Sequence, residues 1–362
     1  MQLIFDGHLD LALFALAYNR DQRATVAEIN AAEEGMTDAQ DRTRAAVSLP
    51  ALRTGRIAVC QSTLAARVAP DCRPTSRLDL DFATPEMAYA SAQGQLAYYH
   101  ALQQHGEIRL LRSATELEEH WQQWERRPAD ALPIGIIISM ECADPILGPW
   151  QVESWWEAGL RSVMLAHFGH SRYAAGTGVA GGLTAAGQTL LSELDRLGMI
   201  LDVSHLSDDS LDQALERFTG PVIASHNNCR ALVPGDRQLT DDQIQRLLER
   251  DGVIGTVLDA WMLVPGWIHG TSTPDTLSLT AVADHIDHIC NLAGDSHHAA
   301  IGSDIGGTNH MPSDFQTAAD LQQLGPILSD RGYNRQDIDN ILYANWLRFF
   351  QKWLPETAVN YE

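Results

Sequence analysis

Short apolar runs rich in β-branched residues recur along the chain, and from about residue 132 most of them are followed by a helical pattern. Two further runs belong to the less regular first third. Eight strands that alternate with helices predict a single (β/α)8 TIM barrel of the α/β class over residues 1–362. A doubly wound parallel sheet would give the same alternation. The expected strands cover residues 3–13, 56–66, 133–144, 162–170, 199–206, 221–228, 253–259 and 297–307.

The helices between these strands carry boundary signals. Thr240 and Gln243 have the spacing of a capping box at the start of the helix expected within residues 239–252. Gly198 stands where a C-terminal cap would close the helix expected within residues 182–198. A third helix is expected to end at Gly220. The segment 263–279 after the seventh strand predicts a long loop that shapes a pocket.

Side chains suited to catalysis or metal binding stand at or just after the C-terminal ends of these strands. In a TIM barrel those ends converge on one mouth, where the active sites of this fold lie. An open sheet would spread them along an edge. The residues are His8, Asp10, Glu141, His167, His205, His226 and Asp304.

The pattern predicts two metal sites. His8 and Asp10 are two positions apart, so in a strand they project the same way and offer a nitrogen and an oxygen to one divalent metal. Alone, the pair is more often a hydrogen-bonded His and Asp at a polar strand end. His205 and His226 end consecutive strands in the same relative place and suit a second metal, although each alone is more often a satisfied histidine.

Two close cations need a bridging anion. Lys352, the only lysine, follows every expected strand, so a carboxylated lysine does not fit. Glu141 comes directly after an apolar run and is the expected bridge, with a glutamate turned into solvent as the alternative. Such a metal pair would generate a bridging hydroxide that attacks a carbonyl group.

Three further residues have expected roles around that chemistry. Asp304 is the candidate general acid and base, unless Ser-Asp before glycines only forms a turn. His167 is expected to hold the oxyanion or the substrate. Arg230, four residues after His226, is a candidate for a bidentate pair with a substrate carboxylate, with a surface salt bridge as the alternative.

Charge and cysteine content narrow the range of binding partners and cellular compartments that we expect. The 47 acidic and 25 basic residues give a formal charge of -22, which disfavours nucleic acid and anionic membranes as partners and attracts cations. The five scattered cysteines indicate a reducing compartment. No signal peptide and no apolar run of membrane-spanning length are evident, so a cytoplasmic protein is expected.

With these residues in place, the sequence resembles the membrane dipeptidase (renal dipeptidase) family, peptidase family M19. The likeness follows the family's order along essentially the whole chain. It is carried by FDGHLDL, SMECADPI, LDVSHLSD, PVIASHNNCRAL, LTDDQIQRLLERDGVIG, AIGSDIGG and YANWLRFF.

The resemblance implies a barrel of the metal-dependent hydrolase type with two Zn2+ per chain. It assigns His8 and Asp10 to one zinc, His205 and His226 to the other, and Glu141 to both. It makes His167 and Arg230 substrate contacts, with Arg230 on the C-terminal carboxylate of the peptide, and Asp304 the proton shuttle. It also implies a dipeptide substrate, tolerance of a D-residue at the C-terminal position, and a homodimer.

Some positions depart from the family pattern, namely Leu9, Cys142, Ala143 and Gly306. The metal ligands are unaffected, whereas the shape of the substrate pocket is in doubt. An alternative is therefore a barrel amidohydrolase that acts on a non-peptide amide or a lactone with the same metals. A metal-binding barrel without turnover is disfavoured because a proton shuttle is retained.

A different class of function is suggested by GTGVAG at residues 176–181, which fits a dinucleotide-binding fingerprint with Asp202 about 20 residues further on. Its glycines begin well after the preceding strand, and a helix is expected only near Thr184, which disfavours this interpretation. Serine and cysteine hydrolases are disfavoured because there is no GxSxG and no cysteine with an evident base partner.

Overall fold

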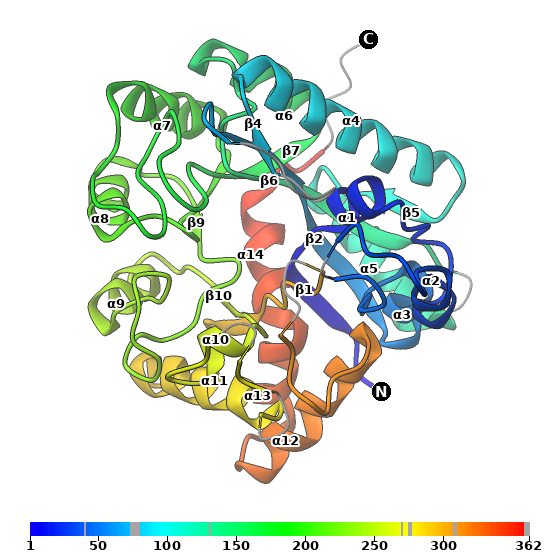
Figure 1. Cartoon of the computed structure of the whole chain (residues 1–362). Helices are drawn as coiled ribbons and strands as arrows, with labels where there is room; N and C mark the ends of the chain where they lie inside the picture. Colours follow the sequence, from blue (N-terminus) through cyan, green and yellow to red (C-terminus); the bar gives the residue numbers. More distant parts are fainter. Residues whose placement is uncertain are drawn as a thin grey trace.

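Each of the eight barrel strands overlaps the segment that the sequence predicts for it but is shorter (Figure 1). The computed structural model describes residues 1–39, 41–72, 80–129, 132–268, 271–273, 277–306 and 310–357. Six parallel strands form a curled sheet in the order β1-β2-β6-β7-β8-β9, and β10 pairs in parallel with β11. The bounds are β1 (Ile4–Leu9), β2 (Ile57–Ala65), β6 (Ile134–Glu141), β7 (Leu160–Met164), β8 (Ile200–Asp202), β9 (Val222–Ile223), β10 (Ile254–Thr256) and β11 (Ala299–Ile301).

Two seams join the β10–β11 pair to the main sheet. At the first, Ala224 forms a parallel bridge with Ile254. At the second, the N–H of Asp304 donates to the carbonyl of His8 over 3.1 Å. The fully buried Asp6 strengthens this seam because its Oδ1 accepts the N–H of Ser303 at 2.8 Å and that of His8 at 3.2 Å. The first and last barrel strands are therefore tied together near their C-terminal ends.

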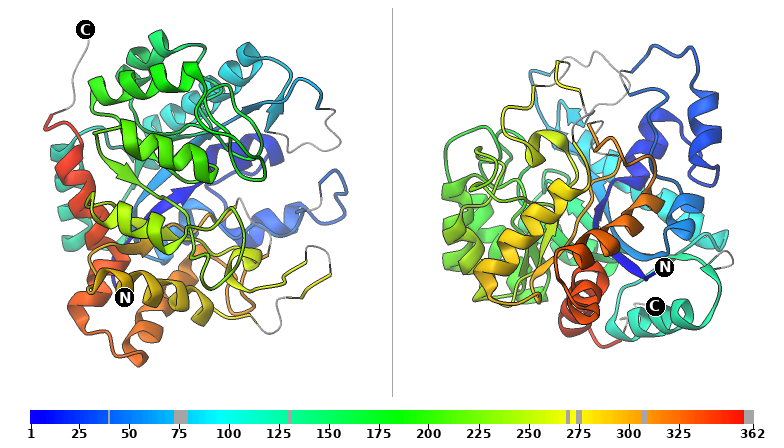
Figure 2. Two further views of the ribbon diagram at one scale, coloured as in Figure 1. Left: turned by 90° about the vertical axis from the view of Figure 1, so that its left-hand side faces the viewer. Right: turned by 90° about the horizontal axis from the view of Figure 1, so that it is seen from below.

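Helices surround the strands, and the segments that follow the strands gather on one side of the barrel (Figure 2). The main ones are α1 (Leu11–Tyr18), α2 (Val26–Ala32), α3 (Leu49–Thr54), α4 (Pro85–Gln104), α5 (Ala114–Arg126), α6 (Val152–Glu157), α7 (Ala185–Leu197), α8 (Asp208–Arg217), α9 (Asp241–Leu248), α10 (Ala260–Leu263), α11 (Thr280–Ala293), α12 (Leu324–Asp330), α13 (Arg335–Asp339) and α14 (Asn345–Trp353). In the described part of the chain, no helix has both the length and the apolar character needed to cross a membrane.

Two of the three predicted helix boundaries are confirmed and one is wrong. The capping box of Thr240 and Gln243 starts α9, and Gly198 ends α7 in the left-handed conformation with φ of 68°, as predicted. The helix expected to reach Gly220 ends earlier, because Phe218 adopts an extended backbone after α8. The loop expected over residues 263–279 lies partly outside the described residues.

Three short strands were not predicted. β5 (Ile108–Leu110) pairs with the start of β6, and β3 (Arg67–Val68) pairs in parallel with β4 (Asp81–Phe82). Strands of two or three residues are too short to show a period in the sequence. The strand expected over residues 199–206, by contrast, is shorter than predicted. It ends at Asp202, since the chain turns there to reach a positive φ of 65° at His205.

The last helix supports the strands beside the site. A Cβ atom at Gly7 would lie 2.5 Å from Cζ2 of Trp346, so only glycine lets α14 pack this closely against β1. The indole Nε1 of Trp346 donates to the carbonyl of Ile301 at 2.8 Å. The strand that carries His8 and the strand that precedes Asp304 therefore share one helix as support.

Candidate metal centre

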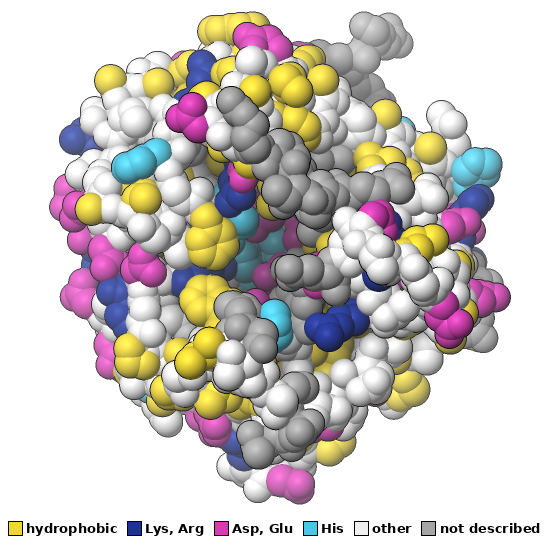
Figure 3. Space-filling model, viewed as in Figure 1, with side chains coloured by type: hydrophobic (Ala, Val, Ile, Leu, Met, Phe, Trp, Pro, Cys, Tyr) yellow, Lys and Arg dark blue, Asp and Glu magenta, His cyan; other side chains and the backbone are white. Residues whose placement is uncertain are grey.

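Seven of the eight predicted site residues meet at the mouth of the barrel. His8 lies in β1, Asp10 directly follows it, and Glu141 is the last residue of β6. The third residue after each of the next strand ends is polar, and these residues are His167, His205, His226, Asp259 and Asp304. Figure 3 shows histidine and acidic side chains at the bottom of a hollow on this face.

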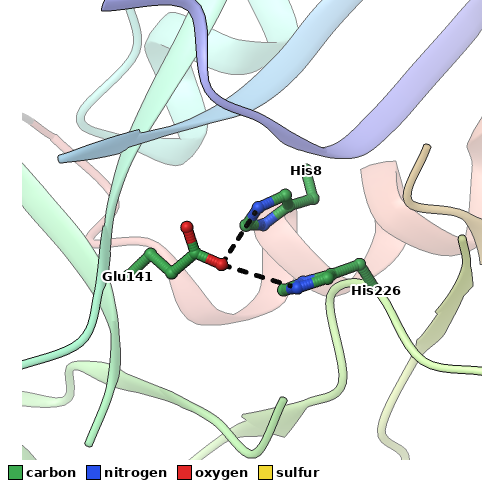
Figure 4. Close-up of side chains that lie close together, drawn as sticks. All are labelled: His8, Glu141 and His226. Carbon is green, nitrogen blue, oxygen red and sulfur yellow. Dashed lines mark ion pairs between the residues drawn. The ribbon is translucent and has the colours of Figure 1, made fainter. Parts of the chain in front are cut away.

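Glu141 lies at the centre of a cluster, which consists of His8, Asp10, Glu141, His167, His205, His226 and Asp304. The Nε2 atoms of four histidines lie close to its Oε1, at 3.6 Å for His8, 3.5 Å for His167, 3.4 Å for His205 and 3.6 Å for His226. Figure 4 shows the carboxylate of Glu141 facing both His8 and His226. Nε2 of His8 is also 3.8 Å from an oxygen of Asp10 and 3.8 Å from one of Asp304.

The backbone is strained where the chain presents these side chains. Cys142, His205 and Asp304 have positive φ values of 74°, 65° and 57°. Non-glycine residues seldom adopt this conformation, and where they do the strain is often found at functional sites. Each of the three belongs to the cluster or directly follows one of its members.

Hydroxyl groups lie behind three of the histidines. Oγ of Ser225 is 3.3 Å from Nδ1 of His8 and 2.9 Å from Nδ1 of His226. Oγ1 of Thr177 is 3.4 Å from Nδ1 of His205. A hydroxyl that accepts a hydrogen bond from Nδ1–H leaves the lone pair of Nε2 for a metal, which is the usual support of a metal-binding histidine.

The carboxylates of the cluster repel one another. Burial raises the pKa of Asp10 to about 6. Burial and the charges of Asp10 and Asp304 raise the pKa of Glu141 well above its usual value, and burial with Asp10 does the same for Asp304. Burial lowers the pKa of His8 to about 3, with a smaller contribution from Arg237. The cluster therefore holds neutral histidines and crowded carboxylates, a combination that a divalent cation stabilises.

The donor atoms of the cluster suit a divalent metal ion. Nε2 of His8 is buried and has no hydrogen-bond partner among the described residues. Histidine nitrogens with carboxylate oxygens are the donor set of catalytic zinc sites. Three sets of ligand atoms lie within 4.8 Å of one another, formed by His8, Glu141 and His226, by Glu141, His167 and His205, and by His8, Asp10 and Asp304.

Arg230 is the predicted residue that the structure does not bring to the cluster. Its two terminal nitrogens each donate to a carboxylate oxygen of Asp208 at 2.8 Å, and Nε donates to the carbonyl of Gln238. The expected bidentate pair therefore exists, but with Asp208 at the start of α8 in place of a substrate. Arg230 is absent from the lining of the cavity beside the cluster.

Arg237, unlike Arg230, lies at the cluster. It is 3 % exposed, lines the cavity, and donates through Nη2 to the carbonyl of His226 at 2.8 Å. Its position in an irregular loop gave no periodic signal in the sequence. The only available hint was that it is a second arginine soon after His226.

The cavity beside the cluster has a volume of about 150 Å³. Its walls combine the polar residues of the cluster with apolar side chains, among them Phe14, Phe168 and Met262. Asp259 also lines it and accepts a hydrogen bond from Nε1 of Trp261 at 2.8 Å. Asp259 was not among the predicted site residues, although it ends the seventh predicted strand as the other site residues end theirs.

The glycine-rich segment 176–181 packs against the chain around His167. A Cβ atom at Gly176 would lie 1.9 Å from the carbonyl oxygen of His167, and the N–H of Thr177 donates to the same oxygen at 3.0 Å. The next helix, α7, begins only at Ala185. Gly176 therefore permits close backbone packing, and the segment does not directly precede a helix start that would bind a pyrophosphate.

Residues 1–357 match the family model described as membrane dipeptidase (peptidase family M19). A Klebsiella pneumoniae protein described as an uncharacterized protein in the pqqA 5' region is 31% identical over 254 residues, which are 67% of this chain and 88% of that protein. Dipeptidase aclJ of Aspergillus oryzae is 34% identical over 196 residues, which are 53% of this chain and 45% of that protein.

The fold is also found among solved structures. A metallo peptidase from Rhodobacter sphaeroides, liganded with a phosphinate mimic of the dipeptide L-Ala-D-Ala, has a TM-score of 0.77 at 22% sequence identity, covering 97% of this chain and 99% of that one. Its fold agrees with the predicted barrel, and the family match extends over nearly the whole chain. The chain belongs to the membrane dipeptidase family, peptidase family M19.

Proposed function

We propose that the protein is a dipeptidase that works with two zinc ions per chain. The observation that carries this proposal is the approach of four histidine Nε2 atoms to Oε1 of Glu141, at 3.4 to 3.6 Å. Membership of the dipeptidase family supports the reaction, and the paired histidine and carboxylate donors support the metal.

The ligands divide into two sets with one shared member. His8 and Asp10 would hold one zinc, His205 and His226 the other, and Glu141 both. When bound, the two zinc ions would act as Lewis acids and would allow water to serve as a nucleophile near neutral pH. The described chain offers no lysine for this bridge, because the ammonium of Lys352 pairs with Asp251 at 2.7 Å.

Arg237 and Asp304 would complete the reaction. The buried guanidinium of Arg237 is suited to a bidentate pair with the C-terminal carboxylate of a peptide, in a place where water competes little. The carboxyl group of Asp304 is raised in pKa by burial and by Asp10, which suits a group that takes a proton from the nucleophile and gives it to the leaving amine.

The cavity favours small substrates. A volume of about 150 Å³ with Phe14, Phe168 and Met262 in its walls suits a dipeptide with short apolar side chains. The L-Ala-D-Ala mimic carried by the Rhodobacter sphaeroides structure supports the proposal that a D-residue is tolerated at the C-terminal position.

The test is hydrolysis of a panel of L,L- and L,D-dipeptides, N-acyl amino acids and lactones, by zinc-loaded protein and by the same protein after chelation. We expect zinc-dependent cleavage of small L,D- and L,L-dipeptides. Two zinc ions per chain with no dipeptide cleavage would reject the dipeptidase and favour the barrel amidohydrolase with a non-peptide amide or lactone substrate.

The homodimer and the cytoplasmic location stay predictions. Light scattering during size-exclusion chromatography tests the dimer, and fractionation of the source cells tests the location.

A further inference from the structure

His167 differs from the other histidines of the cluster in the group behind its ring. Nδ1 of His8, His205 and His226 faces a hydroxyl group, which can accept a hydrogen bond. Nδ1 of His167 lies 2.9 Å from Nη1 of Arg67. A guanidinium has only donors, so in this contact Nδ1 must be the acceptor.

Arg67 is held in place for this contact. Its Nε and Nη2 donate to the two carboxylate oxygens of Asp81 at 2.7 and 2.9 Å. Arg67 and Asp81 face each other as paired residues of β3 and β4. The bidentate pair fixes the plane of the guanidinium and leaves Nη1 directed at His167.

The hydrogen bond determines where His167 carries its proton. A neutral imidazole that accepts at Nδ1 has its proton on Nε2. Nε2 of His167 is on the cluster side of the ring, 3.5 Å from Oε1 of Glu141.

We propose that Arg67 is a positioning residue that fixes the Nε2–H tautomer of His167, so that this histidine donates a hydrogen bond at the mouth and does not ligate a metal. The four histidines thereby divide into three with Nε2 lone pairs and one with an Nε2 proton. The catalytic consequence rests on the proposed function: the Nε2–H of His167 stabilises the oxygen of the scissile peptide group as it gains charge.

The tautomer is measured directly by NMR of zinc-loaded protein with 15N-labelled histidine. The signals of His167 are identified by their loss in His167→Gln. We expect a protonated Nε2 and an unprotonated Nδ1 in the native protein, and a mixed or reversed pattern in Arg67→Ala. An unprotonated Nε2 in the native protein would overturn the proposal. This readout does not depend on turnover, so it decides the tautomer even if dipeptides are not substrates.

Kinetics test the consequence. Arg67→Ala should lower kcat for dipeptides by about 100-fold, the lower range for loss of one transition-state donor, with zinc content and KM nearly unchanged. In the His167→Gln background the same change should cost nothing further, because its effect acts through His167. An equal loss in both backgrounds would show that Arg67 acts on the structure in some other way.

Two controls separate this role from the loss of a salt bridge. Arg109, paired with Glu119 at 2.9 Å, is a matched surface arginine, and Arg109→Ala should leave kcat unchanged. Arg67 also lines a second cavity of about 540 Å³ that reaches His167, so added guanidinium ion can enter the space left in Arg67→Ala. We expect it to restore part of kcat at millimolar concentration, and no recovery at any concentration would count against the proposal.

Discussion

Nη2 of Arg237 lies 3.3 Å from Nε2 of His205, so a positive charge stands directly beside the proposed metal ligands. The guanidinium of Arg230, in contrast, is bound to both carboxylate oxygens of Asp208. The two arginines therefore offer a matched comparison for the binding of a substrate carboxylate.

Arg237→Ala should raise KM for dipeptides by about 100-fold, which corresponds to about 3 kcal/mol for a lost buried charge pair. Bound zinc should stay at two per chain. Arg230→Ala is the control: its KM should be unchanged, and the loss of a partly exposed ion pair should cost only about 1 kcal/mol of unfolding free energy. A normal KM in the Arg237 variant, with a raised KM in the Arg230 variant, would assign the substrate contact to Arg230 after all.

Glu141→Gln should abolish turnover and lower the zinc content below two per chain. The amide that replaces the carboxylate is neutral and a poor bridging ligand, so both ions lose a shared anion. Metal analysis by mass spectrometry after dialysis measures the effect, with Glu193→Gln, at a partly exposed position on α7, as the control. Full zinc occupancy in the Glu141 variant would mean that another residue forms the bridge.

Ser225→Ala should weaken zinc binding by about 10- to 100-fold, the usual cost of losing a group that orients a metal ligand. The single hydroxyl serves Nδ1 of both His8 and His226, so its loss affects both ions. Competition with a chelator of known affinity gives the dissociation constants. Ser192→Ala, which removes a hydroxyl on the surface of α7, should leave them unchanged.

His120 should make stability depend on pH independently of the metals. Its Nε2 lies 2.9 Å from the carbonyl oxygen of Ala58, and burial lowers its pKa from 6.5 to about 4. Between these values the unfolded chain binds a proton that the folded chain does not. The unfolding free energy should therefore fall as the pH drops from about 6.5 towards 4, by up to about 1.4 kcal/mol per unit.

Denaturation of metal-free protein at pH 7 and pH 5 measures this dependence. His120→Gln keeps a donor for the carbonyl of Ala58 but does not titrate, so it should lose less stability than the native protein between the two pH values. Equal losses in the two proteins would show that His120 is protonated equally in the folded and unfolded states.

The strands and most of the cluster were predictable because they depend on local patterns. A run such as residues 134–141, apolar until Glu141, indicates both a buried strand and the point where a polar side chain enters the mouth. Since parallel strands bring such points together, the convergence of His8, His205 and His226 follows from the fold class. Asp259 also closely follows a barrel strand, so the same rule places it at the mouth with the other site residues.

The arginine contacts could not be predicted in this way. Whether Arg230 or Arg237 reaches the cavity is decided by Asp208, which binds Arg230 from a different segment. The contact between Arg67 and His167 depends on β3 and β4, whose two-residue strands leave no pattern in the sequence. Both contacts join separate segments of the chain, where side-chain geometry and not periodicity determines the outcome.

The hydrogen bond between Asp6 and Ser303 has a consequence for biosynthesis. It joins residues 297 positions apart, and contacts of such separation form late in folding because a long loop must close first. While the ribosome is still making the middle of the chain, β1 has no β11 beside it, and the histidine of the first strand is not yet held in its final place. We therefore expect newly made chains to bind zinc only after β11 has been translated. Metal uptake by these chains would then indicate that the barrel has closed.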